Sequence, residues 1–210
     1  MKDTIYSREQ YLRKKAAEKE PLNIQLTNNY AFRKLFKMNY IARGFLIALL
    51  GLDEEDVVKL EVIDPFEEGE NEEEKEGILD IKIYLNDNKK INIEMQNRYQ
   101  EDWTERSLFY NCRMFTEGLY HGQPYGDLEP CIHVGILDFD LMKTPGFHHH
   151  IKLLDIKTNE EYSSKLQFHV VQLKQVESAT EEEKQTELYY WAKLLAAKDW
   201  KQVEETIRGN

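Results

Sequence analysis

The sequence has few cysteines and no long hydrophobic run. Its two cysteines, Cys112 and Cys131, are too few for a disulfide framework or a structural zinc site. The longest apolar run, residues 45–50, has six residues, far short of the ~18 that a membrane span needs. The first residues also lack the apolar segment of a secretory signal. We therefore expect a soluble, cytoplasmic protein.

Positive charge is scarce as well. The 210 residues include 28 Lys and Arg against 39 Asp and Glu, for a net charge of −11. This balance argues against a polybasic protein that binds nucleic acid through its overall positive charge. Seven of the acids fall within residues 66–76, which predicts a solvated loop, with metal collection as the alternative. Residues 8–19 form a modest basic arm, which is either a phosphate-contacting segment or a frayed terminal helix.

The chain contains enough apolar residues for a hydrophobic core, since they make up 41% of it. Apolar residues recur at helical spacing across 29–50, and Gly51 follows as a helix-ending signal. Thr27, Asn28 and Asn29 are candidate caps for this helix. Residues 57–63 are rich in β-branched side chains and predict a strand that ends in a turn.

Two segments with alternating apolar residues, 78–85 and 91–96, predict a β-hairpin joined by the turn-rich residues 86–90. If the apolar side chains of both strands face one core, the opposite face carries polar groups. These are Asp80, Lys82 and Tyr84 on the first strand and Asn92, Glu94 and Gln96 on the second. A turn centred near residue 87 sets Asp80 opposite Glu94, with their Cβ atoms about 5 Å apart.

Residues 101–120 predict a helix that packs on this sheet. Its expected apolar stripe is Leu108, Cys112, Phe115 and Leu119, while Arg106, Tyr110, Arg113 and Glu117 share another face. Residues 131–139 and 166–173 predict further strands, and we expect both Cys112 and Cys131 to be buried.

Thr180 and Glu183 resemble a capping box that opens a last helix. Three consecutive histidines, residues 148–150, predict a polar loop, because they cannot all face one metal from regular structure. The order helix, three strands, helix, strand indicates an α/β fold with a mixed sheet flanked by helices.

The paired carboxylates suit a divalent metal. Asp80 and Glu94 on adjacent strands would share Mg²⁺ or Mn²⁺, and the backbone carbonyl of Met95 would add a ligand. Such a metal polarises a phosphodiester and lowers the pKa of an attacking water, which Gln96 would hydrogen-bond without supplying charge. The alternative is that Asp80 and Glu94 are ordinary exposed carboxylates at strand ends.

Several short motifs together resemble a known family. They are Asn-Asn-Tyr-Ala-Phe-Arg-Lys-Leu-Phe at 28–36, Leu-Asp-Ile-Lys at 79–82, Asn-Ile-Glu-Met-Gln at 92–96, Arg-Ser-Leu-Phe-Tyr at 106–110 and Gly-Gln-Pro-Tyr at 122–125. In these motifs the chain resembles the PD-(D/E)XK nuclease family transposases, the group of recombination-promoting nucleases and transposases. The resemblance covers about residues 27–175.

The resemblance implies a restriction-endonuclease-like αβββαβ core with a C-terminal strand and helix added, and Mg²⁺- or Mn²⁺-dependent cleavage of DNA. Asp80 and Glu94 become metal ligands, and Gln96 takes the place of the family's lysine. Arg106, Tyr110 and Arg113 would lie beside the metal ligands or against DNA phosphates. Asn29 stands where the family pattern has an acid.

The expected organisation has three parts: an N-terminal basic arm or helix over 1–26, the nuclease-like domain over 27–175, and a shortened C-terminal helical extension over 176–210. DNA is the expected partner, and a homodimer is implied by the resemblance alone. The competing hypothesis is a catalytically silent module that keeps the nuclease fold for nucleic-acid binding or assembly. An acidic surface, the uncharged Gln96 and Asn29 favour that alternative.

Overall fold

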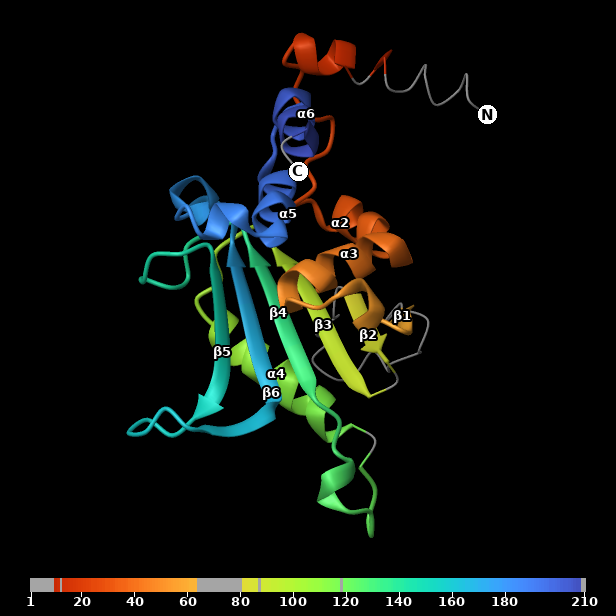
Figure 1. Ribbon diagram of the computed structural model, residues 1–210, viewed down its shortest axis with the longest axis vertical. Helices are drawn as coiled ribbons and strands as arrows, with labels where there is room; N and C mark the ends of the chain where they lie inside the picture. Colours follow the sequence, from red (N-terminus) through yellow and green to blue (C-terminus); the bar gives the residue numbers. More distant parts are fainter. Residues whose placement is uncertain (1–9, 12, 64–80, 87, 118, 209–210) are drawn as a thin grey trace.

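A six-stranded mixed sheet with helices on both faces forms the protein (Figure 1). The computed structural model describes residues 10–11, 13–63, 81–86, 88–117 and 119–208. Its strands are β1 Leu60–Ile63, β2 Ile81–Leu85, β3 Lys89–Gln96, β4 Cys131–Leu137, β5 His148–Leu154 and β6 Glu161–Gln172. Their order across the sheet is β1-β2-β3-β4-β6-β5. The α/β class is confirmed, but the predicted acidic loop at 66–76 lies outside the described residues.

The helices are α2 Asn29–Phe36, α3 Asn39–Leu50, α4 Trp103–Thr116, α5 Glu187–Ala196 and α6 Trp200–Arg208. The single helix predicted over 29–50 is wrong, because the chain breaks it at residues 37–38. Asn28 caps α2 by accepting the backbone N–H groups of Tyr30 and Ala31, and Gly51 ends α3 with a left-handed φ of 63°. No described helix is long and apolar enough to cross a membrane.

The strand pairing explains how the hairpin and α4 are related. β1, β2 and β3 are antiparallel neighbours, whereas β4 runs parallel to β3, so the chain must cross over between them through α4. Ile81 pairs with Ile93 and Lys82 with Asn92. The predicted hairpin register is therefore confirmed over Ile81–Leu85, whereas Asp80 lies outside the described residues.

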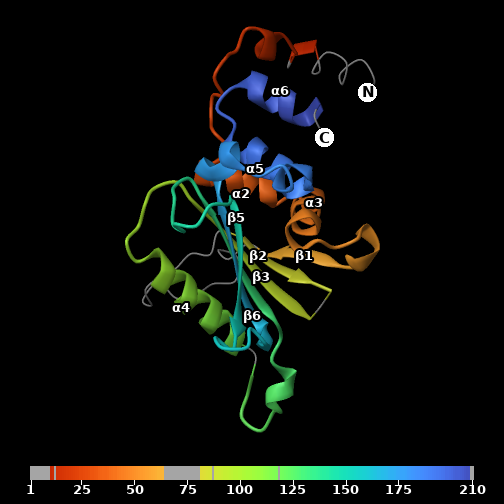
Figure 2. The same cartoon turned by 60° about the vertical axis from the view of Figure 1, so that its left-hand side comes forward.

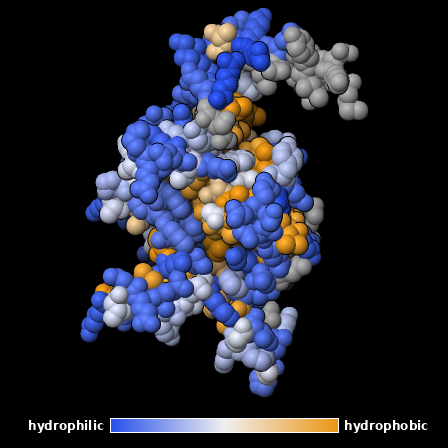
Figure 3. Space-filling model, viewed as in Figure 1, coloured by the Kyte–Doolittle hydropathy of each residue, from blue (hydrophilic) through white to orange (hydrophobic). Residues whose placement is uncertain are grey.

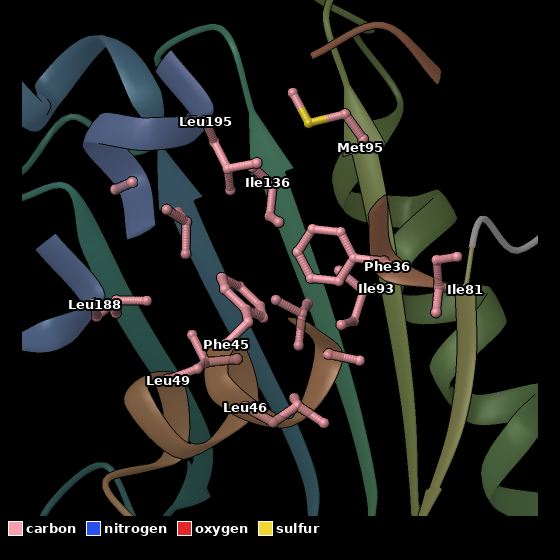
Figure 4. Close-up of a cluster of buried hydrophobic side chains, with 14 of the residues drawn as sticks. Phe36, Phe45, Leu46, Leu49, Ile81, Ile93, Met95, Ile136, Leu188 and Leu195 are labelled. Carbon is pink, nitrogen blue, oxygen red and sulfur yellow. The ribbon is translucent and has the colours of Figure 1, made fainter. Parts of the chain in front are cut away.

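The main hydrophobic core lies on the sheet face covered by α2, α3 and α5 (Figure 4). Phe36 stacks edge-on against Phe45, at 5.1 Å between ring centroids, and Phe45 contacts Trp191 of α5 in the same way. Complete burial of one such side chain stabilises the fold by about 2 kcal/mol. On the surface seen in Figure 3, hydrophobic patches gather near the middle of the molecule, and both ends are hydrophilic.

Helix α4 covers the opposite face of the sheet (Figure 2). The apolar stripe predicted for it is wrong, since Leu108 is 45% exposed and Cys112 is exposed. The buried α4 residues are instead Trp103, Ser107, Asn111 and Met114. The buried residues belong to neither of the two predicted faces, and this partly polar stripe packs on strands that carry polar side chains. Cys131 is buried as predicted, and burial raises the pKa of its thiol to about 12.

The C-terminal part of the chain differs in detail from expectation. Thr180 and Glu183 form the reciprocal hydrogen bonds of a capping box, but the turn that follows is a short 3₁₀ helix, Glu183–Gln185. Helix α5 begins only at Glu187, and the Thr186 hydroxyl caps it by accepting the Tyr189 N–H. The strand predicted at 166–173 is longer than expected, because it begins at Glu161.

Edge strand β5 contains the three consecutive histidines, so the predicted polar loop is wrong. The alternation of a strand sends His148 and His150 to one face, where both stack on His169 of β6 at centroid distances of 5.2 and 4.1 Å. The His148 and His169 rings share a hydrogen bond of 2.9 Å. Burial, followed by the charges of neighbouring histidines, lowers the pKa of His148 to about 4 and that of His169 to about 3.

These histidines predict acid sensitivity. Because their pKa values in the folded protein lie below the ordinary ~6.5, the unfolded chain binds more protons below that pH, and stability falls as the pH falls. For the buried His169 the loss by pH 5 is about 2 kcal/mol. Denaturant unfolding at pH 7 and at pH 5 measures this loss of folding stability. His169→Phe should reduce the difference and the exposed His121→Gln should not, whereas equal stabilities at both pH values would contradict the account.

Candidate active site

Glu94 is a buried carboxylate at the centre of the polar sheet face. It belongs to β3, is 2% exposed, and lies beneath α4. Nη2 of Arg106 lies 2.8 Å from Oε1 of Glu94. A buried carboxylate is costly unless a charge or hydrogen bonds compensate it, and the guanidinium of Arg106 supplies that compensation.

Arg106 is itself held in place by its surroundings. Its Nη1 donates to Oε1 of Gln100 at 3.1 Å, and its guanidinium carbon lies 5.7 Å from the centre of the Tyr110 ring. The Arg106 side chain is 31% exposed, so it is partly accessible to solvent while its Nη2 contacts Glu94. This arrangement places a cation between the buried carboxylate and the surface.

Both ends of α4 are fixed on the sheet, which sets the position of Arg106. At the N-terminal end, the indole of Trp103 packs over Gly135, the β4 residue paired with Glu94. At the C-terminal end, the buried Lys90 ammonium donates to the carbonyls of Met114 and Glu117. A cation at this end of a helix is favourable because the last carbonyls and the helix dipole are negative there.

A second buried lysine lies on the same face. Lys82 Nζ contacts Oε2 of Glu117 at 3.2 Å, and Lys90 Nζ contacts Oε2 of Glu129 at 3.3 Å. These contacts direct both ammonium groups toward the C-terminal end of α4. Arg106, by contrast, is in direct contact with Glu94.

His133 of β4 lies on the other side of Glu94. It is fully buried, and its Nε2 is 3.8 Å from Oε2 of Glu94. Its Nδ1 lies 3.1 Å from Nδ2 of Asn92, two residues before Glu94 on β3. Burial, and then the charge of Arg106, lowers the pKa of His133 to about 3, so the ring is neutral at neutral pH.

The structure brings together only some of the residues predicted for the site. Glu94, Arg106 and Tyr110 lie together, but the Gln96 amide donates to the carbonyl of Arg98 at 3.0 Å. Arg113 is half-buried two turns along α4 from Arg106. The Met95 side chain is part of the hydrophobic core.

The backbone near Met95 suits the predicted carbonyl ligand. The carbonyl of Gln96 accepts from the N–H of Asp138, which follows β4. Successive carbonyls of a strand point in opposite directions, so that of Met95 points toward the β2 side of β3. Its role as a metal ligand remains a prediction.

Sequence reasoning did not assign roles to His133, Lys82, Lys90 or Asn92. A signal was present for Asn92 and Lys90, because they alternate with isoleucines in a strand and therefore had to share the face of Glu94. His133 gave no such signal, since β4 is buried on both faces and its sequence does not alternate.

The donor chemistry of the site fits a hard divalent cation. Glu94 supplies a carboxylate whose Oε1 is already in contact with a positive charge, and carboxylate oxygens are ligands that Mg²⁺ prefers. Within the described residues no group of three or more His, Cys, Asp or Glu side chains is arranged to hold a metal. Asp80, the second predicted ligand, lies outside them.

Two clefts lie away from Glu94. One of about 740 Å³ is lined by α5, α6 and Asp138, with Lys174, Lys193 and Lys198 facing Glu177 and Glu205. The other, of about 390 Å³, lies near the C-terminal end of α4 and includes Lys90 and Glu117. Neither of these two clefts is lined by Glu94.

A family model described as PD-(D/E)XK nuclease family transposase matches residues 26–210. This chain belongs to the PD-(D/E)XK nuclease family transposases. Comparisons with curated proteins and with solved structures found no match. The restriction-endonuclease-like fold is confirmed by the order α3, β1, β2, β3, α4, β4 and by this membership.

Membership of the PD-(D/E)XK nuclease family transposases supports a role related to nuclease or transposase chemistry. Nucleases with this fold generally use divalent metals.

Proposed function

We propose that the protein is a metal-dependent endodeoxyribonuclease that hydrolyses phosphodiester bonds of DNA during transposition or recombination. One observation carries this proposal: the buried Glu94 carboxylate lies on the β3 strand of a PD-(D/E)XK fold and is matched by the cation of Arg106. Charged groups are costly to bury, and those that are buried in a cleft or site gather at functional sites.

Glu94 and Asp80 are the proposed metal ligands. Asp80 immediately precedes Ile81 in the sequence, and Ile81 pairs with Ile93, next to Glu94. When bound, Mg²⁺ or Mn²⁺ polarises the scissile phosphate and lowers the pKa of a bound water. The carbonyl of Met95, which points toward β2, is the proposed additional ligand.

Arg106 is the proposed contact to the DNA phosphate. Its guanidinium carries a fixed positive charge and presents several N–H donors, which suits the planar recognition of phosphate oxygens. If Glu94 held a divalent cation, that cation would compensate the carboxylate in place of Arg106, and the guanidinium would be available for this contact. Arg106 thereby supplies positive charge that the uncharged Gln96 does not.

We propose supporting roles for Gln96, Tyr110 and Arg113. The Gln96 amide must leave the Arg98 carbonyl to hydrogen-bond the attacking water. Tyr110 supports the guanidinium of Arg106 through its ring. Arg113 lies on the same helix as Arg106, and its proposed role is to meet a phosphate further along the strand.

Metal removal tests the proposal. Supercoiled plasmid incubated with the protein and Mg²⁺ or Mn²⁺ should be converted to the nicked form, excess EDTA should stop the reaction, and added Mg²⁺ should restore it. The cation requirement follows from the proposed role of Asp80 and Glu94 as ligands of the metal that activates the water. Folded protein that binds DNA without nicking it in either metal would instead favour the catalytically silent module.

A further inference from the structure

The hydrogen-bonding state of His133 is determined by its neighbours. A neutral imidazole has one N–H donor and one acceptor nitrogen, and its partners decide which is which. Nδ1 of His133 lies 3.1 Å from the Asn92 amide nitrogen, which can only donate. Nδ1 is therefore the acceptor, and the proton resides on Nε2.

The electrostatics of Glu94 favour the same tautomer. Nε2 of His133 lies 3.8 Å from Oε2 of Glu94, and neither Nε2 nor Oδ1 of Asn92 has a hydrogen-bond partner in the described part of the chain. Rotating the Asn92 amide would place a proton on Nδ1 and direct the lone pair of Nε2 at a carboxylate, which is repulsive. With the proton on Nε2, a shift of about 0.9 Å completes a hydrogen bond to Glu94.

The two oxygens of Glu94 therefore have different partners. Oε1 contacts the half-exposed Arg106, whereas Oε2 faces the fully buried His133. His133 is fixed by packing as well, because its ring lies between those of Trp103 and Phe168, at centroid distances of 5.9 and 6.2 Å. A fully buried group beside one oxygen and a partly exposed cation on the other make the two oxygens inequivalent.

We propose that His133 is a positioning residue for Glu94: its Nε2–H, oriented by Asn92, holds Oε2 and leaves Oε1 to exchange between Arg106 and the cation. The inference rests on the proposed function, since it requires Glu94 to bind a divalent metal. Groups that orient a metal-binding carboxylate typically raise metal affinity 10- to 100-fold.

The tautomer is tested directly on the full-length protein. A ¹⁵N correlation spectrum of the imidazole groups at pH 7.5, assigned with His133→Gln, should show His133 with its proton on Nε2. Asn92→Asp replaces the donor by an acceptor and should place a proton on Nδ1. A wild-type His133 with its proton on Nδ1 would overturn the inference, whatever the metal affinity.

Metal affinity distinguishes a positioning role of His133 from a purely structural one. Glutamine places its amide nitrogen near the position of Nε2, whereas asparagine reaches only that of Nδ1. In Mn²⁺ titration calorimetry His133→Gln should bind within about threefold of wild type, and His133→Asn should bind at least tenfold more weakly. The control is His169→Gln, a buried histidine on the opposite face of the sheet, which should leave affinity unchanged.

The same titration distinguishes the two proposals. If Glu94→Gln abolishes binding but His133→Asn binds like wild type, the positioning inference fails and the metal role of Glu94 stands. If wild-type protein binds no Mn²⁺, or if Glu94→Gln binds it unchanged, the metal role fails and the inference fails with it.

Discussion

Glu94→Gln and Asp80→Asn should each lower the rate of metal-dependent plasmid nicking at least thousandfold. Each substitution keeps the shape of the side chain and removes one charged metal ligand. The expected loss corresponds to about 4 kcal/mol of transition-state stabilisation, which is of the size that a bound metal supplies. Single-turnover nicking rates in saturating Mg²⁺ measure the effect.

Glu61→Gln is the matched control for these variants. Glu61 is an exposed acid of β1 that pairs with Tyr84 and so lies on the same sheet face as Glu94. Its substitution should leave the rate unchanged. Nicking by Glu94→Gln at the wild-type rate, with the same thermal unfolding midpoint, would contradict the assignment of Glu94.

Gly135→Ala should destabilise the protein by about 3 kcal/mol, because a Cβ at this position would fall inside the indole of Trp103. Trp103 is buried and begins α4, so the helix must shift to make room. Displacement of α4 also moves Arg106 away from Glu94. We therefore expect nicking to fall in samples that are still folded.

Denaturant unfolding measures the first effect, with Gly126→Ala as control, since a Cβ at Gly126 would meet no atom within 4 Å. The control should change the free energy of unfolding by less than about 0.5 kcal/mol. Combining Gly135→Ala with Trp103→Leu should cost less than the sum of the single substitutions. Additive losses would show that the indole is not what excludes the methyl group.

Local patterns in the sequence predicted the hairpin well. Strict alternation in β2 and β3 fixed which side chains share a face, so Lys82, Asn92 and Glu94 were placed together correctly. The same reasoning failed for α4. Neither face predicted from helical spacing is the buried one, because the stripe that packs on the sheet is partly polar and matches the polar strands beneath it.

Long-range contacts explain what the sequence did not reveal. β5 was missed because its histidines are polar in isolation, and they become strand residues only through stacking on His169. The role of Arg106 was only partly anticipated, since its contact with Glu94 depends on how Trp103 and Lys90 fix α4. That Asp80 lies opposite Glu94 on the neighbouring strand remains a prediction.

The location of the metal is the central claim, and one measurement tests it most directly. Fe²⁺ bound in place of Mg²⁺, with ascorbate and peroxide, cleaves the polypeptide next to the metal, and mass spectrometry identifies the cut positions. We predict cuts near residues 80 and 94–96 that disappear in Glu94→Gln. Cuts confined to the acidic residues 67–76, or unchanged in Glu94→Gln, would contradict the account.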